Sequence, residues 1–147
     1  MSGARTRSAR RQRLKSVVLD SYAVLAFLFK EAGYEKVTTA LEKASESENP
    51  LLIAAPNWSE ICCLVQRKVG RLKWQESRAK LLGLPIEVVP VGIELAEMAG
   101  EMKATKKMSL ADCFAAALAK QKKAEIYTGD PEFQAVEKEI RIVWILS

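Results

Sequence analysis

The sequence predicts an α/β domain with three layers, in which a mostly parallel sheet is covered by helices on both faces. Short β-branched or apolar runs alternate with longer segments of helical spacing along the chain, and this alternation is typical of strand–helix–strand units. No internal repeat, low-complexity segment or linker interrupts the pattern after residue 15. A length of 147 residues fits one domain with a sizeable core.

The first half of the chain predicts two strands and three helices. The run "SVVLD" (16–20) reads as a strand that ends at Asp20, and "SYAVLAFLFKEAG" follows as a helix that ends at Gly33. "YEKVTTALEKASES" (34–47) has the spacing of an amphipathic helix, and "LLIAA" (51–55) that of a buried strand. "PNWSEICCLVQRKVG" (56–70) predicts a helix opened by Pro56 and Asn57, with Glu60 in its first turn.

The second half continues the alternation with further helices and strands. "KWQESRAKLLGL" predicts a helix, "IEVVPV" a strand, and "IELAEMAGEMKATKK" a helix with one apolar face. A helix that begins at Ser109, the strand "AEIYTG", a short helix after Pro131 and a last strand "IRIVWIL" complete the chain.

Composition excludes several kinds of chemistry. The chain has no histidine, which removes Ser-His-Asp triads, histidine-based ribonuclease chemistry and the usual zinc sites. Its three cysteines lie in apolar segments without a CxxC motif, which favours free thiols in a reducing cytosol. The longest apolar stretch is interrupted by Asp20 and is too short to span a bilayer as a plain helix. We therefore expect a soluble, cytoplasmic protein.

The positive charge is concentrated at the N-terminus. Residues 1–15 carry six basic side chains and no acid, so that subtracting them from the net charge of +5 leaves −1 for residues 16–147. We expect residues 1–15 to form a basic tail that is disordered in isolation, and residues 16–147 to form the domain. An arm attracted to RNA phosphate, an upstream translation start or expression artefact, and a transit-like leader all fit this tail; we favour an accessory or accidental tail.

Four acids recur at predicted helix starts: Asp20, Glu60, Asp112 and Asp130. In a parallel sheet the carboxyl ends of the strands lie along one edge, where such folds bind ligands. Asp20 and Asp130 directly follow predicted strands and Glu60 follows one after a short turn, so we expect these three at that edge. Asp112 follows a helix, so the topology alone does not place it there.

Each acid also has a structural explanation when taken singly. Asp20 can cap its helix, and Asp130 before Pro131 has the pattern of a helix cap. "NWSE" and "SLAD" both have the spacing of a capping box, in which an acid accepts a hydrogen bond from the cap residue. What favours a functional role is that the same positions converge on one edge of the sheet.

Converging acids imply a cation. Two like charges about 4 Å apart repel by roughly 4 kcal/mol at an effective dielectric of 20, so such a pocket requires protons or metal ions. Oxygen ligands without histidine or cysteine suit Mg²⁺ or Mn²⁺, which commonly bridge to substrate phosphate. The acids therefore favour metal-assisted hydrolysis of phosphodiester bonds.

Four segments in order, "VVLDSYAVLAFL", "NWSEI", "SLADCFAAALAK" and "YTGDPEF", resemble the acidic motifs of the PIN-domain ribonucleases, and most closely the VapC-type toxins of toxin–antitoxin pairs. The resemblance covers about residues 16–147 and implies a PIN-like fold. It implies that Asp20, Glu60 and Asp112 are the central metal-site acids, with Asp130 as a fourth. One such motif would be unspecific, whereas four in order are specific.

Two hydroxyls and one further acid lie next to these motifs. Ser21 follows the first acid and Thr128 precedes the last by two residues, where the family often has a hydroxyl that holds water or an acid in place. Both can also be ordinary turn or cap hydroxyls. We leave Glu132 out of the site because the family varies there, and because an acid at this position favours a helix N-terminus by itself.

The resemblance also implies a reaction and partners. The reaction is metal-dependent cleavage of RNA that leaves 5′-phosphate and 3′-hydroxyl ends. The partners are a second copy of the chain, giving a homodimer, and a cognate antitoxin whose C-terminal segment blocks the acidic site. Basic residues near the motifs can attract the RNA backbone as a local patch or form solvated helix faces: Arg67, Lys68, Arg71, Lys106, Lys107, Lys120, Lys122 and Lys123.

Other functions remain open from the sequence. The same fold can serve as a nucleic-acid or protein-binding module without catalysis, or as an RNA-processing nuclease outside a toxin–antitoxin pair. A phosphatase with an aspartyl-phosphate intermediate would use Asp20 as nucleophile, but such families typically have a second aspartate where this chain has Tyr22. A receiver domain would not explain Glu60 and Asp112. Metal-dependent RNA cleavage distinguishes a nuclease from the binding module, the phosphatase and the receiver domain.

Overall fold

A sheet of five parallel strands forms the centre of the computed structural model, which describes residues 15–146. Its order is β3-β2-β1-β4-β5, and every neighbouring pair among these strands is parallel. This confirms the predicted fold class, and the expected "mostly parallel" sheet is parallel throughout the described residues. The strands are β1 (Val17–Leu19), β2 (Leu51–Ala54), β3 (Ile86–Val89), β4 (Glu125–Thr128) and β5 (Ile142–Trp144).

The helices follow the predicted order closely. They are α2 (Ser21–Phe29), α3 (Tyr34–Ser47), α4 (Ala55–Val69), α5 (Arg71–Leu82), α6 (Ile93–Thr105) and α7 (Leu110–Lys122). The short helix expected after Pro131 is a 3₁₀ helix, η1 (Pro131–Val136), in which the side chain of Asp130 accepts a hydrogen bond from the backbone N–H of Glu132.

One prediction about α4 is wrong. The helix begins directly after β2, with Ala54 as the capping residue, so the capping box that the spacing of Asn57 and Glu60 allows does not form. Pro56 lies in the first turn, where its fixed φ and missing N–H cost nothing. Asn57 is therefore inside the helix and fully buried, and Glu60 lies in the second turn rather than in the first.

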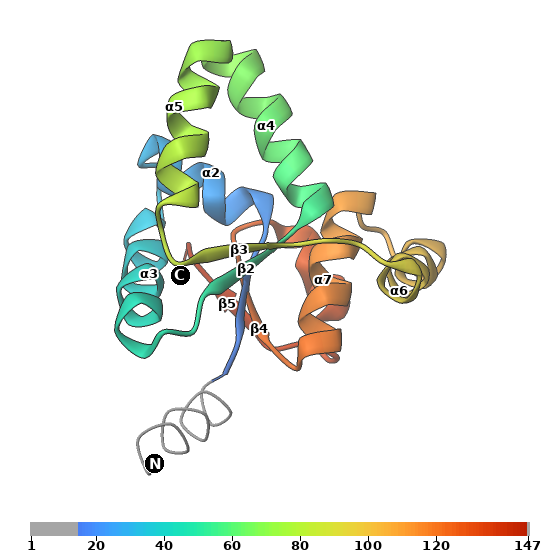
Figure 1. Ribbon diagram of the computed structural model, residues 1–147. Coiled ribbons are helices and arrows are strands. Elements are labelled where there is room, and N and C mark those ends of the chain that lie inside the picture. Colours follow the sequence, from blue (N-terminus) through green and yellow to red (C-terminus); the bar gives the residue numbers. More distant parts are fainter. Residues whose placement is uncertain (1–14, 147) are drawn as a thin grey trace.

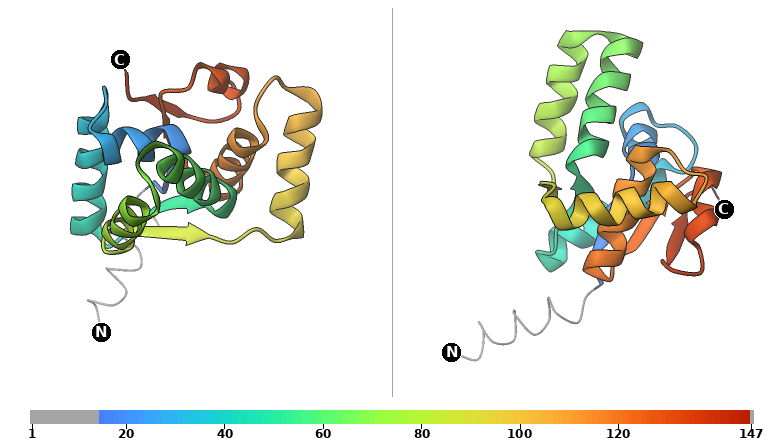
Figure 2. Two further views of the ribbon diagram at one scale, coloured as in Figure 1. Left: turned by 90° about the horizontal axis from the view of Figure 1, so that it is seen from above. Right: turned by 90° about the vertical axis from the view of Figure 1, so that its right-hand side faces the viewer.

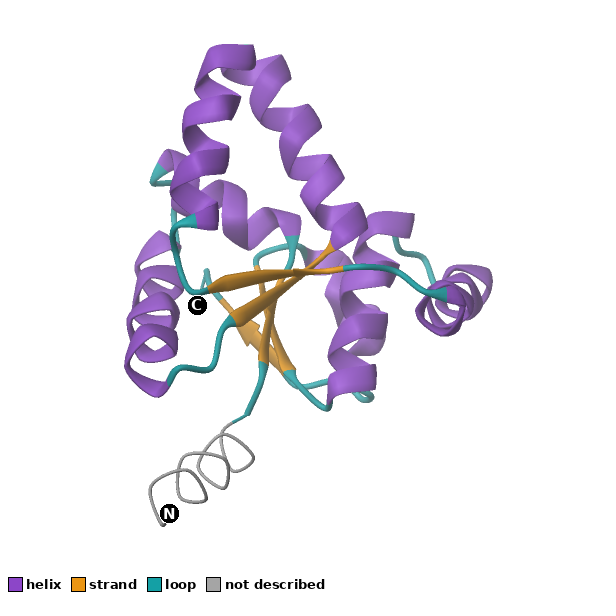
Figure 3. Cartoon of the chain, viewed as in Figure 1, coloured by secondary structure: helices purple, strands orange, loops and turns teal. Residues whose placement is uncertain are grey.

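Helices cover both faces of the sheet, as expected (Figures 1 and 3). Along β1 the side chains alternate: Val18 belongs to the core shared with α6 and α7, and Leu19 to the core shared with α2, α3, α4 and α5. Helix α7 is buried against the sheet through a run of small residues, since the segment from Ala115 to Ala119 is fully buried. The two cores fix the strand ends from which the candidate site is built.

Helices α4 and α5 form a hairpin that projects away from the sheet on the side where α2 lies (Figures 1 and 2). Gly70 makes the turn with a φ of 89°, a conformation that favours glycine. The rings of Trp58, near the start of α4, and Trp74, near the start of α5, meet edge to face, with centroids 5.5 Å apart. This contact joins the two helices of the hairpin.

The predicted basic tail lies outside the described residues, apart from Lys15, so its state remains a prediction. Within residues 15–146, none of the helices combines the length and the apolar character that crossing a membrane requires.

Candidate metal centre at the carboxyl edge of the sheet

Asp20 follows β1 and is fully buried. One carboxylate oxygen accepts the N–H of Ala23 at 2.8 Å, which caps α2 as the sequence allows, and the other accepts the hydroxyl of Thr128. Burial raises the pKa of Asp20 to about 7 despite these two hydrogen bonds, and the charges of Asp130 and Glu60 raise it further. Burying an ionised carboxylate costs free energy, and a helix cap alone does not require this burial.

Thr128 connects two of the acids. It ends β4, directly across from β1, because Leu19 pairs with Tyr127 in the sheet. Its hydroxyl donates to Asp20 and accepts the backbone N–H of Asp130 at 2.9 Å. The buried hydroxyl thus fixes Asp20 relative to the turn that carries Asp130. The sequence position of Thr128 predicted a supporting hydroxyl, and its contacts agree with holding an acid in place.

Asp112 lies in the first turn of α7, where the cap residue Ser109 accepts the N–H of Asp112 at 3.3 Å. In a capping box Asp112 would accept the N–H of Ser109 in return. That N–H donates instead to a carboxylate oxygen of Glu132 at 2.6 Å. The capping role passes to Glu132, and the carboxyl of Asp112 is 5% exposed beside Asp130.

The environment of Asp112 strongly disfavours its charge. Burial, a hydrogen bond to Asp130 and the charges of Asp130 and Asp20 together raise its pKa to about 8. Asp112 and Asp20 are therefore two carboxyls of one electrostatic cluster, although they come from opposite faces of the sheet. The placement that topology left open for Asp112 is settled by this proximity.

Asp112, Asp130 and Glu132 form a group of acids close enough together to share a metal ion. One carboxylate oxygen from each lies within 4.8 Å of the other two, and the group passes from the buried Asp112 to the exposed Glu132. Glu132 is the residue that sequence reasoning left out. Its contact with Ser109 joins segments that are 23 residues apart, so local sequence could not reveal it.

Glu60 and Ser21 lie near Asp20 but outside the group of three acids. Glu60 is half-buried in α4 and its charge acts on Asp20, but it is not one of the three grouped acids. The hydroxyl of Ser21 accepts the side-chain amide of Asn57 at 3.2 Å and donates to the Asn57 carbonyl at 3.4 Å. Ser21 therefore ties α2 to α4, close to Asp20, rather than contacting an acid.

Gly129, between Thr128 and Asp130, allows a close approach at the edge of the cluster. A Cβ atom at Gly129 would lie 2.2 Å from a ring carbon of Tyr22, far inside contact distance. Tyr22 is 39% exposed, so its ring covers the strand end while one side faces solvent. Glycine is required here by space rather than by backbone conformation.

The donor set fits a divalent cation. All candidate ligands are carboxylate oxygens, which suit Mg²⁺ or Mn²⁺. The three aspartates of the sequence, Asp20, Asp112 and Asp130, all belong to this cluster, whereas the 15 glutamates are spread over the chain. Asp112, Asp130 and Glu132 can hold an ion, and Asp20 and Glu60 add negative potential. The positive charge of a bound cation would offset the repulsion between carboxylates that contributes to the raised pKa values of Asp20 and Asp112.

Comparisons with known proteins agree on the fold. The family model of the PIN domain matches residues 17–139. No curated protein matches the sequence. Among solved structures, VapBC2 from Rickettsia felis, bound to a DNA fragment from its promoter, has a TM-score of 0.71 at 14% identity, covering 86% of this chain and 96% of that chain.

Two further solved structures are similar. DNA-bound VapBC from Salmonella typhimurium has a TM-score of 0.71 at 14% identity, with 90% of this chain and 99% of that chain covered. VapC20 of Mycobacterium tuberculosis, a toxin that cleaves the sarcin–ricin loop, has a TM-score of 0.61 at 20% identity, with coverages of 82% and 95%.

Proposed function

Because this chain belongs to the PIN domain family, we propose that it is a metal-dependent endoribonuclease and the toxin of a VapBC-type toxin–antitoxin pair. The observation that carries the proposal is the cluster of carboxyls at one edge of a parallel sheet, with pKa values of about 7 for Asp20 and about 8 for Asp112. Strongly perturbed carboxyls in a group are characteristic of functional sites. Capping alone does not require burial of several acids side by side.

In this proposal Asp112, Asp130 and Glu132 hold Mg²⁺ or Mn²⁺. Asp20 and Glu60 lie nearby and add negative potential at the ion site. The chemistry that an ion held by these residues would supply is activation of a water and neutralisation of the charge on the scissile phosphate. The chain's own residues fix the geometry: Thr128 holds Asp20 against the Asp130 turn, and Glu132 joins that turn to the start of α7. The exposed Glu132 marks the side of the cluster that is open to a substrate.

The partners follow from the same proposal. The similar structures from R. felis and S. typhimurium are complexes of a toxin with its antitoxin, which supports a cognate antitoxin for this chain. A homodimer, an RNA substrate and a cytoplasmic location complete the proposal. Growth arrest on expression of the wild type but not of Asp112→Asn would distinguish a toxin from an RNA-processing enzyme.

Cleavage of labelled RNA by the purified protein with Mg²⁺, Mn²⁺ or EDTA tests the catalytic part. Asp112→Asn should abolish cleavage, because it removes a buried charge of the ion site. Glu97→Gln is the matched control, since it removes one negative charge from the exposed face of α6. Metal-dependent cleavage that is lost in Asp112→Asn and kept in Glu97→Gln supports the proposal. Cleavage that survives in Asp112→Asn refutes this site.

A further inference from the structure

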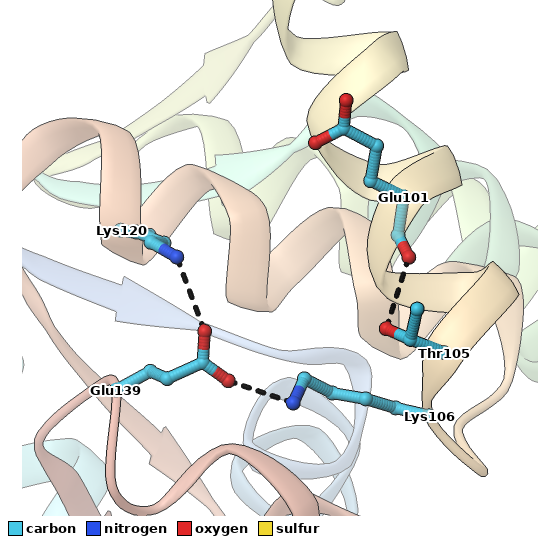
Figure 4. A network of polar contacts seen from close by, with 5 residues as sticks. All are labelled: Glu101, Thr105, Lys106, Lys120 and Glu139. Atoms are coloured by element: carbon cyan, nitrogen blue, oxygen red, sulfur yellow. Dashed lines mark hydrogen bonds and ion pairs between the residues drawn. The ribbon is translucent and has the colours of Figure 1, made fainter.

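The basic residues near the motifs differ in whether their side chains are free to contact an RNA backbone. Lys106 and Lys120 both form ion pairs with Glu139, at 2.8 and 3.1 Å (Figure 4). These two lysines are therefore engaged within the protein. Lys122 is near the end of α7, about 15 Å along the helix from Asp112 at 1.5 Å per residue. These positions do not form a path that starts at the acids.

Helix α4 does form such a path. Arg67 follows Glu60 by seven residues, which places both on one face of the helix about 10 Å apart along its axis. Residues 67–73, at the tip of the α4–α5 hairpin, contain four basic side chains and no acid. Arg67 and Arg71 are exposed, and neither has an ion pair with another described residue.

A groove runs between α2 and α4 beside this basic face. It has a volume of about 360 Å³, and Leu25, Phe29 and Leu64 give it an apolar lining. Arg67 and Lys68 line it as well, together with the acid Glu31. Lys68 is engaged there, since its ammonium lies 4.2 Å from the centroid of Phe29 and 3.7 Å from Glu31. Arg67 has no ion pair within residues 15–146 and lies at an apolar groove.

We propose that the α2–α4 groove, with Arg67 in its lining and Arg71 at the adjoining tip of the α4–α5 hairpin, is the path along which a single-stranded segment of the RNA substrate leaves the acidic cluster. An apolar floor beside a basic rim matches unpaired bases and their phosphates. The groove is bounded by α2, which begins directly after Asp20, and by α4, whose N-terminal half carries Glu60. This inference rests on the proposed nuclease function, because it names how the substrate of that site is held.

The test measures binding of a fluorescent 12-nucleotide single-stranded RNA to the full-length protein in EDTA, over a series of NaCl concentrations. The variant is Arg67→Glu/Arg71→Glu. Removing two phosphate contacts should weaken binding about tenfold near physiological salt and reduce the slope of log affinity against log salt by about 1.4, from roughly 0.7 per contact. The matched control is Lys43→Glu/Lys122→Glu, which makes the same charge change at exposed positions in the C-terminal halves of α3 and α7.

A selective loss in the groove variant supports the proposal. An equal loss in the control overturns it, because net charge then explains the binding. Wild-type affinity in the groove variant also overturns the proposal, and so does a wild type that binds no RNA at low salt. A partner protein that binds the groove while RNA binding is unaffected overturns it as well. Arg67→Gln/Arg71→Gln, with a melting curve for each variant, guards against misfolding.

The binding measurement is independent of cleavage, because EDTA removes the metal. A wild type that binds RNA through the groove but cleaves nothing with Mn²⁺ would refute the nuclease and leave the groove intact. A wild type that cleaves with Mn²⁺ while the groove variant binds RNA normally would support the nuclease and refute the role of the groove.

Discussion

Asp20→Asn should make the stability of the metal-free protein less dependent on pH. The folded protein raises the pKa of Asp20 from 3.8 to about 7, so between these values the folded state holds a proton that the unfolded chain has released. Stability that is fully present below pH 4 is therefore lost as pH rises towards 7. An amide at this position does not titrate, and this loss disappears.

The expected magnitude follows from the shift. At about 1.4 kcal/mol per unit, the whole shift corresponds to about 4 kcal/mol, and the part between pH 5 and pH 8 to about 3 kcal/mol. Asparagine keeps one acceptor for Ala23 or Thr128 and loses the other, which costs about 1 to 2 kcal/mol at both pH values. Taking the difference between the two pH values removes this constant cost.

The assay is thermal unfolding of the wild type and Asp20→Asn at pH 5 and pH 8 in EDTA. The wild type should lose about 10 °C more than the variant between these pH values, at roughly 3 °C per kcal/mol for a domain of this size. Adding Mn²⁺ at pH 8 should restore more stability to the wild type than to the variant. Parallel pH curves for the two proteins would refute the reasoning, because Asp20 would then have an ordinary pKa in the folded state.

Three other substitutions test separate contacts. Thr128→Val removes the hydroxyl that lowers the pKa of Asp20, so unfolding in EDTA at pH 8 should show a loss of about 2 kcal/mol; an unchanged midpoint would argue against the hydrogen bond. Glu132→Gln keeps an acceptor for Ser109 but removes the charge, so the Mn²⁺ affinity measured by calorimetry should fall about tenfold. The control Glu137→Gln, at an exposed neighbouring position, should leave the affinity unchanged. Equal affinities in the wild type and Glu132→Gln would assign Glu132 to capping alone. Gly129→Ala forces a Cβ atom against Tyr22 and should destabilise the protein by about 1 to 3 kcal/mol; if the double variant with Tyr22→Ala is no more stable than Gly129→Ala, the clash is not the cause.

The order and type of the elements could be predicted because local patterns and packing agree. The β-branched run ending at Leu19 and the amphipathic spacing of 34–47 predicted β1 and α3 with nearly the observed bounds. The start of α4 could not be predicted, since Asn57 has the residue type of a cap but is buried by tertiary contacts with Ser21. A proline near a helix start does not by itself say which position it occupies.

Some residues of the candidate site could likewise be predicted from the sequence, and others could not. Asp20 and Asp130 follow strands of a parallel sheet, so their common edge follows from topology. Asp112 needed the family resemblance, because no strand precedes α7. Glu132 could not be found from either source, since its role depends on how the η1 turn packs on the start of α7. Contacts between distant segments are what the sequence leaves undetermined.

Among the described residues β1 is the earliest strand and the middle strand of the sheet, and Thr128 at the end of its neighbour β4 lies 108 residues from Asp20. During synthesis β1 therefore has no partner on that side until β4 has left the ribosome. Asp20 cannot meet Asp130 before then, and shorter nascent or truncated chains lack the complete cluster. Assembly of the cluster thus depends on the pairing of β1 with β4, and local folding around any one acid is not enough.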